Sequence, residues 1–452
     1  MEFAPHTDDD VAQMLAVIGR SSIDDLFAHL PAAARFGGTL DMPAGLSEAA
    51  LLRETAALAG RNRHADDMVC FLGAGAYDHH IPSMVWPLLM RGEFLTSYTP
   101  YQPELSQGVL QALFEYQTMV AELTGLDVSN ASLYDGGSAL PEAVSMAAGA
   151  TGRDAVVIAG AVNPLYLQVL ATAAVGPGIE IRRAGRTAAG TVDASEVARL
   201  AQGAAAVAVQ QPNFFGCIED VPALAEIAHA AGAKLIVHTD LTALGVLEGP
   251  GALGADIVVG EGQSLGNHLN FGGPYVGVIA CRRDDVRRLP GRLVGETVDR
   301  RGRRAFVLTL QAREQHIRRE KATSNICTNQ TLNALATAIT LAWLGPAGLR
   351  EMGQACLAKA RYARERLCEV AGATPAFEAA HFKEFCVRLP ADPVRVAEHA
   401  AADGYLAGVP VRTLLPGDGL DDGLLVAVTE KRTRAEIDAM VEAVARACKA
   451  VA

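Results

Sequence analysis

The chain has 452 residues, of which 50% are hydrophobic and 20% charged, so it can bury a large core and is not a disordered protein. Its formal net charge of −12 argues against non-specific binding of nucleic acid, which requires a basic surface. No apolar run reaches the length of a membrane span, Ala334 to Leu344 being the nearest approach, and the amino-terminal residues lack the pattern of a signal peptide. We expect two or three domains, a cytoplasmic location, and no membrane or nucleic-acid partner.

The eight cysteines are spread along the chain rather than grouped. They form no CxxC pair, and no Cys/His cluster has the spacing of a zinc site. In a chain of this length without an export signal, we interpret them as reduced, mostly buried thiols. No metal site is expected.

Residues 1–60 are predicted to form an amino-terminal helical segment. Thr7 caps a run with apolar residues on one face, which Gly19 ends, and Ser22 with Asp25 repeats the capping pattern. Further along, a longer helix is indicated from Ser106 to Gly125 by apolar residues at helical spacing.

From about residue 150 the sequence alternates between short apolar runs and helical stretches. Such alternation predicts a mostly parallel sheet with helices on both faces, in a large α/β domain that spans residues 61–330. Ligands bind at the carboxyl ends of the strands in such sheets, where Asp240 and the glycine-rich turn from Gly260 both fall. The expected strands are Ala155–Ile158, Ala204–Val209, Leu235–Val237, Ile257–Val259 and Tyr275–Ala280, with Val221–Ala231 as a crossover helix.

Residues 331–452 are predicted to form a smaller α/β domain. A long helical segment runs from Ala334 to about Val370, and strands follow at Phe385–Leu389 and Leu424–Val428, each with a helix after it. Thr433 and Glu436 form a capping box for the last helix.

The stretch from Cys281 to Lys321 is the basic region of the chain, with a formal charge of +7. The simpler interpretation is a solvated helix from Arg313 to Lys321, in which residues three and four apart pair. The more specific interpretation is that this basic region forms a docking surface for an acidic partner.

A lysine is missing where the surrounding pattern is typical of a pyridoxal-phosphate enzyme. The strand that starts at Lys234 ends on Asp240, an acid suited to a pyridine nitrogen, and a second strand leads into the turn Gly260–Gly266. Such enzymes form a Schiff base with a lysine amine near the end of that turn. The nearest polar candidates here are Gln263, Ser264, Asn267 and His268, and none of these side chains can form an imine.

Three further segments could bind a ligand. Prolines make Leu95–Glu104 a rigid loop from which Tyr98, Thr99 and Tyr101 project, although an ordered connector is an equal alternative. Gly136, Gly137 and Ser138 begin a helix and could hold a phosphate, while a simple helix cap is the commoner role. Thr323, Ser324 and Asn325 follow the basic region and could either bind a phosphate or cap the next helix.

Long motifs along nearly the whole chain resemble the glycine cleavage system P-protein, and more narrowly the amino-terminal, or α, subunit of its two-chain form. These motifs are Phe71–Gly75 with Tyr77–His79, Thr96–Glu104, Asn130–Asp135, Gln211–Gly216 with Ile218–Asp220, Gly260–Gly266 and Arg313–Cys327. The resemblance implies fold type I of the pyridoxal-phosphate-dependent transferases, an aspartate-aminotransferase-like α/β architecture. It also implies an α2β2 assembly in which a separate β subunit carries the Schiff-base lysine and binds pyridoxal phosphate covalently. No covalent cofactor is expected on this chain, which alone would be inactive.

The family reaction would be the decarboxylation of glycine, with transfer of the aminomethyl group to the lipoyl arm of the H protein. On this interpretation Tyr98, Thr99 and Tyr101 shape a shared active site, and Thr323, Ser324 and Asn325 reach toward the cofactor phosphate of the partner. Gly136, Gly137, Ser138, Asp240, Ser264 and His268 would belong to a degenerate cofactor site of this chain's own. Two alternatives stay open: a non-catalytic scaffold or regulatory subunit, and an independent enzyme that binds the cofactor non-covalently and uses His268 as its base.

Overall fold

The structure, a computed structural model, describes residues 5–38 and 40–451 in two compact units, of which one ends at Arg63 and the other begins at His64. In the first unit, helix α1 (Asp8–Val17) begins with Thr7 as its N-cap, as predicted, and Asp10 completes a capping box with it. The second predicted helix of this unit is only a 3₁₀ turn, Asp24–Phe27, and helix α2 (Glu48–Ala59) follows it. Helix α1 buries one side chain and α2 none.

The second unit contains a seven-stranded sheet in the order β2-β8-β7-β6-β5-β3-β4. Strands β3 to β7 are parallel, as the sequence predicts, while at one side β8 pairs antiparallel with both β7 and the edge strand β2. Strand β4 was not predicted, because three of its five residues are charged and leave no apolar run. The bounds are β2 Val128–Ser129, β3 Ala155–Ala159, β4 Glu180–Ala184, β5 Ala206–Gln211, β6 Lys234–Asp240, β7 Ile257–Glu261 and β8 Gly277–Cys281.

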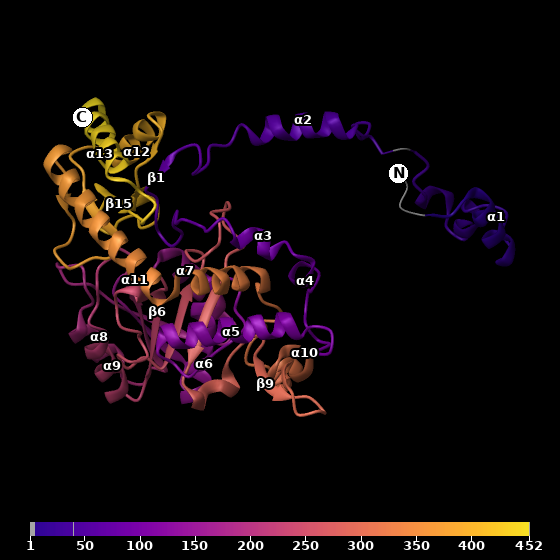
Figure 1. The fold of residues 1–452 in the computed structure, drawn as a ribbon, viewed down its shortest axis with the longest axis horizontal. Coiled ribbons are helices and arrows are strands. Elements are labelled where there is room, and N and C mark those ends of the chain that lie inside the picture. The colour runs from indigo at the N-terminus through magenta and orange to yellow at the C-terminus, as the bar shows by residue number, and fades with distance from the viewer. Residues whose placement is uncertain (1–4, 39, 452) are drawn as a thin grey trace. The chain divides into compact units, whose positions relative to one another are not determined.

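Helices cover both faces of this sheet (Figure 1). Successive strand residues point to opposite faces, so Val157 packs in one core and Val156 in the other. The first core includes α5 (Gln107–Thr124), α8 (Ala194–Leu200), α9 (Val221–Ala230) and the beginning of α11 (Thr331–Val370). The second includes α6 (Gly136–Thr151) and α7 (Pro164–Val175). The predicted helix from Ser106 to Gly125 is confirmed as α5, with Gly125 as its left-handed C-cap.

A smaller antiparallel sheet has the order β11-β12-β15-β14 and packs with its own helices around a separate core. The two predicted strands of this region are confirmed as β12 (Glu384–Arg388) and β15 (Gly423–Ala427). Near the start of the unit, β1 (Val69–Cys70) pairs with β13 (Tyr405–Leu406), which brings the segment after Cys70 against the small sheet. The other elements are β11 Thr374–Pro375, β14 Val409–Pro410, α12 Pro393–Ala402, α13 Arg434–Val451, α3 Val85–Leu89 and α4 Gly92–Leu95. The predicted domain boundary near residue 330 stays a prediction.

Helix α11 joins the two cores, and Figure 1 shows it running from the large sheet to the small one. Gly345, with a φ of 59°, and Pro346 interrupt it, so α11 is two helices in series. By length and composition α11 is apolar enough to cross a membrane, a result that the sequence reading did not anticipate. Its alanines pack into both cores, which is the pattern of a buried core helix, and such helices pass the same test.

The basic region does not contain the continuous helix that was the simpler prediction. Strands β9 (Val294–Val298) and β10 (Arg304–Leu308) form a hairpin, and beyond it only the short helix α10 (Gln315–Arg318) lies between two 3₁₀ turns. Leu310 and Arg319 have φ values of 52° and 54°, which break the helix on either side. The prediction failed because Arg313 turns inward to donate to the Leu289 carbonyl instead of pairing along a helix.

Candidate functional site

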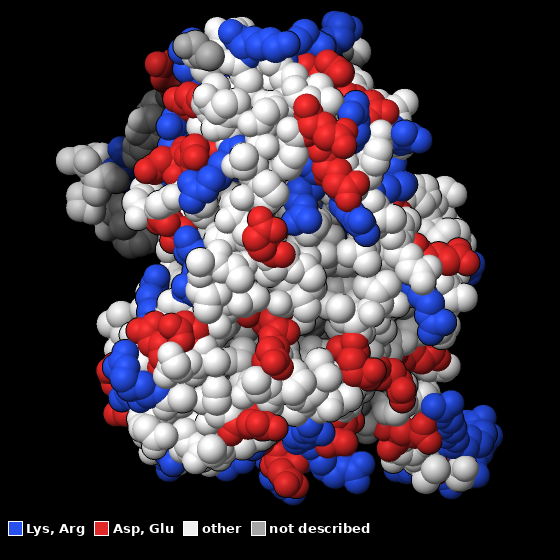
Figure 2. Space-filling model, turned by 90° about the vertical axis from the view of Figure 1, so that its left-hand side faces the viewer, with Lys and Arg blue, Asp and Glu red and all other residues white. Residues whose placement is uncertain are grey.

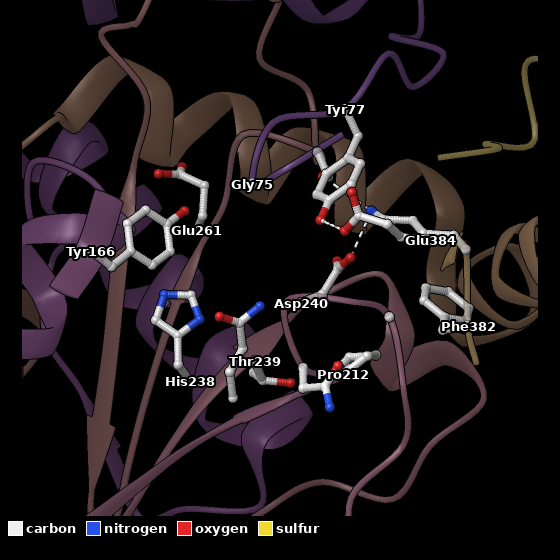
Figure 3. A pocket seen from close by; sticks show the side chains of 15 residues that line it. Gly75, Tyr77, Tyr166, Pro212, His238, Thr239, Asp240, Glu261, Phe382 and Glu384 are labelled. Carbon is white, nitrogen blue, oxygen red and sulfur yellow. Dashed lines mark hydrogen bonds and ion pairs between the residues drawn. The ribbon is translucent and has the colours of Figure 1, made fainter. Parts of the chain in front are cut away.

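A small pocket of about 40 Å³ lies at the carboxyl ends of β5, β6 and β7. The loop after β1 and the start of β12 close it from the side of the small sheet, so both sheets contribute to its walls. Figure 3 shows Tyr166, His238 and Glu261 on one side of Asp240, and Tyr77 and Glu384 on the other. The lining residues are Gly75, Tyr77, Tyr166, Gln210, Pro212, Asn213, Gly216, His238, Thr239, Asp240, Glu261, Ser264, Phe382, Lys383 and Glu384.

Lys383 fills the part of the pocket in front of Asp240. Its Nζ lies 2.6 Å from Asp240 Oδ2, and its side chain is only 2% exposed. The same nitrogen donates to His79 Nε2 at 2.8 Å and to Thr242 Oγ1 at 3.1 Å. Burial alone would raise the pKa of Asp240, but the charge and hydrogen bond of Lys383 hold it below its ordinary value. Asp240 is therefore an ionised carboxylate that already has a cationic partner.

A buried polar chain continues beyond Lys383. Because an ammonium group has no lone pair, His79 Nε2 must accept from Lys383, and His79 Nδ1 then carries the proton toward Glu430 Oε2, 2.6 Å away. Burial and the nearby charge of Lys383 lower the pKa of His79, which agrees with a neutral ring. Cys356 Sγ donates to the same Glu430 oxygen at 3.5 Å. His79, Cys356 and Glu430 could together approach a metal ion, but these contacts already engage their ligand atoms; the expectation of no metal stays a prediction.

Glu261 fills the opposite end of the pocket, at the N-terminus of α6. Its Oε2 accepts from the backbone N–H of Gly136 at 2.9 Å, and its Oε1 accepts from those of Gln263 at 2.9 Å and Val276 at 3.2 Å. A Cβ at position 136 would lie 3.0 Å from Glu261 Cβ and 3.1 Å from His238 Nε2, so glycine is what allows this approach. Burial raises the pKa of Glu261 to about 8.

Aromatic and acidic groups occupy the rest of the pocket. The Tyr166 ring packs on the His238 imidazole with 4.8 Å between ring centroids, and burial lowers the pKa of His238 to about 4. On the other side, the Tyr77 hydroxyl donates to Glu384 Oε2 at 2.8 Å. Burial raises the pKa of Glu384 to about 7.

The residues of this pocket do not fit pyridoxal phosphate. Asp240 would have to serve the pyridine nitrogen, but Lys383 already lies against it. The first amide of α6 would have to serve the phosphate, but Glu261 already accepts from it. The remaining 40 Å³ is space for at most a few water molecules and not for a cofactor ring.

The structure brings only some of the predicted degenerate-site residues together. Asp240 and Ser264 line the pocket, and Gly136 touches it through Glu261. Ser138 instead forms a capping box with Asp135. His268 is exposed, packs against Trp86 at 5.4 Å between ring centroids, and is not part of the pocket lining.

The predicted recognition loop lies on the surface beside a hollow of about 950 Å³. Tyr98 is 81% exposed and Tyr101 53% exposed, and both line that hollow together with Thr99. The Thr99 hydroxyl oxygen is buried and has no hydrogen-bond partner among the described residues. The Tyr98–Tyr101 loop therefore presents aromatic surface outward.

The buried guanidinium of Arg292 connects this loop with the segment that follows the basic region. Its Nη1 donates to Thr328 Oγ1 and Asn329 Oδ1, both at 3.0 Å, while its carbon Cζ lies 5.6 Å from the centroid of the Tyr101 ring. In that segment Thr323 and Asn325 are exposed, whereas the Ser324 hydroxyl accepts from the Ile326 N–H at 3.0 Å. Arg292 thus links Tyr101 to Thr328 and Asn329, which follow the predicted Thr323–Asn325 segment in the chain.

Sequence reasoning missed Lys383, Glu261 and His238. His238 and Asp240 are two residues apart in one strand and therefore face the same way, and Glu261 pairs with Asp240 across the sheet, so the pattern contained a signal for both. Nothing in the sequence marked Lys383, because a charged residue just before an apolar strand usually lies in solvent.

The fold defines a class, that of the fold-type-I pyridoxal-phosphate enzymes, and side chains of this chain fill the pocket at the carboxyl ends of its strands. The model of the glycine cleavage system P-protein family matches residues 1–444, and the chain belongs to this family.

Proteins and structures similar to this chain agree with that assignment. The "probable glycine dehydrogenase (decarboxylating) subunit 1" of Carboxydothermus hydrogenoformans is 50% identical to this chain. The match covers 98% of this chain and 99% of that protein. The protein of the same name from Moorella thermoacetica has the same identity and the same coverage. A crystal structure of an inhibitor-bound glycine decarboxylase (P-protein) of the glycine cleavage system is 44% identical, with a TM-score of 0.90 over 99% of this chain and 100% of the other. A cysteine desulfurase of Thermococcus onnurineus is 18% identical, with a TM-score of 0.63 over 85% of this chain and 96% of the other, and shows the fold alone.

Proposed function

We propose that this chain is the α subunit of a two-chain glycine decarboxylase and lends surface residues to an active site completed by a lysine-bearing β subunit. The observation that carries the proposal is the contrast between its two candidate sites. The pocket that should hold the cofactor is filled by the chain's own side chains, whereas Tyr98 and Tyr101 are exposed beside a large hollow. Relatives named subunit 1 match the chain from end to end, and a name of that kind implies a second subunit.

The reaction is the decarboxylation of glycine, followed by transfer of the aminomethyl group to the lipoyl arm of the H protein. Pyridoxal phosphate, held covalently by the β subunit, supplies the electron sink for the loss of CO2. The residues of this chain bind and orient: the Tyr98 and Tyr101 rings narrow the entrance for glycine and the lipoyl arm, and exclude water. Thr323 and Asn325 direct a hydroxyl and an amide toward the partner's cofactor phosphate. Ser324 acts within the chain, because its hydroxyl accepts from the Ile326 N–H.

The amino-terminal unit supports an assembly with other chains, which we propose is α2β2 in the cytoplasm. Several of its large apolar side chains are exposed, including Val17 at 87% and Phe36 at 73%. An apolar surface of this kind is usually covered by a partner. The basic Cys281–Lys321 region is a candidate surface for the β subunit or for an acidic carrier protein. By contrast, Figure 2 shows acidic and basic side chains interspersed on the face that it draws.

The test is co-expression of this chain with and without a lysine-bearing β subunit, measuring the exchange of bicarbonate into glycine. We expect exchange only with the pair. Tyr98→Phe and Asn325→Ala should lower turnover while the complex still assembles in size-exclusion chromatography. Tyr362→Phe is the matched control, because it removes a tyrosine hydroxyl that bonds Asp438 in the small-sheet region.

Each alternative has its own outcome in the same experiment. Full activity of the Tyr98→Phe and Asn325→Ala complexes would favour a scaffold or regulatory subunit. Exchange by this chain alone, lost in His268→Ala, would favour the independent enzyme and contradict the proposal.

A further inference from the structure

The pocket contains two anchor points that a protein of this fold offers to pyridoxal phosphate, and side chains of this chain occupy both. The first anchor is Asp240, against which Lys383 Nζ lies at 2.6 Å. The second is the N-terminus of α6, where Glu261 Oε2 accepts from the Gly136 N–H at 2.9 Å. A protonated pyridine nitrogen would donate to the first anchor, and a phosphate oxygen would accept from the second. Lys383 and Glu261 therefore make contacts of the same kind as the cofactor would.

We propose that Lys383 and Glu261 are a built-in substitute for the cofactor, which keeps this chain's own pocket closed to pyridoxal phosphate. The cation of Lys383 stands in for the pyridine N–H, and the carboxyl of Glu261 stands in for the phosphate. The loss of cofactor binding on this chain then has two causes: the missing imine-forming lysine and the occupation of both anchors.

The hydrogen bonding of both side chains is complete, which is why they hold their places. The three donors of Lys383 Nζ are engaged by Asp240, His79 and Thr242. Both oxygens of Glu261 accept backbone N–H groups, from Gly136 on one oxygen and from two further residues on the other. A satisfied buried network of this kind is costly to open, because each separated group loses a partner without gaining water.

The substitution also fixes the two sheets to each other at the pocket. Lys383 directly precedes β12 of the small sheet, and Asp240 ends β6 of the large sheet. Gly216, on the large-sheet side, approaches the Glu384 carbonyl so closely that a Cβ would lie 1.7 Å from its oxygen. The ion pair and this contact therefore both hold the small sheet against the large one beside the pocket.

Lys383 invites a rival interpretation, in which its amine forms an imine with pyridoxal phosphate. The Tyr77 ring covers that amine, with 3.8 Å between Nζ and the ring centroid, and the nitrogen points at a carboxylate. An amine in this position is engaged by three partners and covered by a ring, so it is shielded from an aldehyde. The two interpretations differ in whether borohydride reduction in the presence of pyridoxal phosphate leaves a label from this cofactor on Lys383.

The experiment uses the full chain without a β subunit, so its outcome does not depend on the proposed shared site. Pyridoxal phosphate is titrated by absorbance up to millimolar concentration, and the sample is then reduced with borohydride and mapped by mass spectrometry. We expect no saturable binding and no label on Lys383 in the unaltered chain. Lys383→Ala/Glu261→Ala should gain saturable, dialysable binding, with half-saturation at least tenfold below the highest concentration at which the unaltered chain shows none. Lys431→Ala, which removes a lysine paired with Asp78 outside the pocket, should gain none.

Two results would overturn the proposal. The first is saturable binding, or a label on Lys383, in the unaltered chain. The second is a double variant that is folded, as judged by circular dichroism, and still gains no binding. If the double variant does not fold, competitive acetylation of the unaltered chain decides. Lys383 should then react at least tenfold more slowly than Lys431 whether or not pyridoxal phosphate is present. A reactive Lys383 that pyridoxal phosphate protects would contradict the proposal.

Discussion

Replacement of Lys383 by methionine keeps most of the side-chain volume but leaves Asp240 buried without its cation. The Asp240 side chain is 16% exposed and that of Lys383 2%, so water compensates only in small part for the lost partner. Removal of one partner from a buried ion pair costs ~3–5 kcal/mol. With about 2.1 cal/mol/K of unfolding entropy per residue over the unit from His64 onward, this cost lowers the melting temperature by roughly 4–6 °C.

The effect should depend on pH. In the unaltered chain Asp240 has a lowered pKa, so its contribution to stability is present above its unfolded pKa and is lost as pH falls through the lower folded value. In Lys383→Met, burial acts without the opposing charge and raises the pKa of Asp240, so the variant recovers stability by protonation as pH falls from 7.5 toward 4. The difference in melting temperature between the two proteins should therefore shrink over that range.

Scanning calorimetry at several pH values measures this difference. Asp240→Asn/Lys383→Met should recover much of the stability and lose the pH dependence, because neither charge remains. Lys431→Met is the control, since the side chain of Lys431 is 31% exposed and its partner Asp78 keeps a second contact with Arg432; a partly exposed pair is worth at most ~1 kcal/mol. A Lys383→Met protein as stable as the unaltered chain at pH 7.5, or a difference that does not change with pH, would refute the reasoning.

Three further predictions concern other parts of the molecule. Gly216→Ala places a Cβ 1.7 Å from a backbone carbonyl oxygen at a φ of +83°. It should lower the free energy of unfolding by more than ~4 kcal/mol and reduce the soluble yield. Gly203→Ala is the control, because its φ is +73° but no atom lies within 4 Å of the added Cβ, and it should lower the free energy of unfolding by only ~1–2 kcal/mol in chemical denaturation. The stability of Glu261→Gln relative to the unaltered chain should increase as pH rises from 4.5 to 8 and should level off above pH 8. The reason is that the pKa of Glu261 is raised to about 8 in the folded state, so ionisation of this carboxyl destabilises the unaltered chain. Thermal melts at each pH measure the difference, and a difference that does not change with pH would contradict the prediction. Arg292→Lys should lower stability by ~1–3 kcal/mol through the loss of its paired contacts, and should slow glycine–bicarbonate exchange by the assembled complex; unchanged exchange would mean that the Tyr98–Tyr101 loop does not need this support.

Local patterns were sufficient to predict the central strands of both sheets and several of the longer helices. The apolar runs of β3, β5, β6 and β7 are buried on both faces, so composition alone marks them as central strands. The edge strand β4 has no such run, and the Arg313–Lys321 segment has charges at helical spacing without a helix. In both cases the decisive contacts are made with distant parts of the chain.

The candidate site likewise has features that local sequence determines and features that depend on distant parts of the chain. The sequence by itself determined that no lysine follows the glycine-rich turn, that Asp240 ends a central strand, and that Tyr98 and Tyr101 lie in a proline-stiffened loop, because these are properties of chemical identity and local backbone geometry. Only the tertiary structure decided what lies against Asp240: Lys383 is 143 residues further along the chain and arrives through the packing of the small sheet against the large one. The electrostatics of a buried carboxylate depend on neighbours within a few ångströms, and that distance is set by the fold rather than by spacing along the sequence.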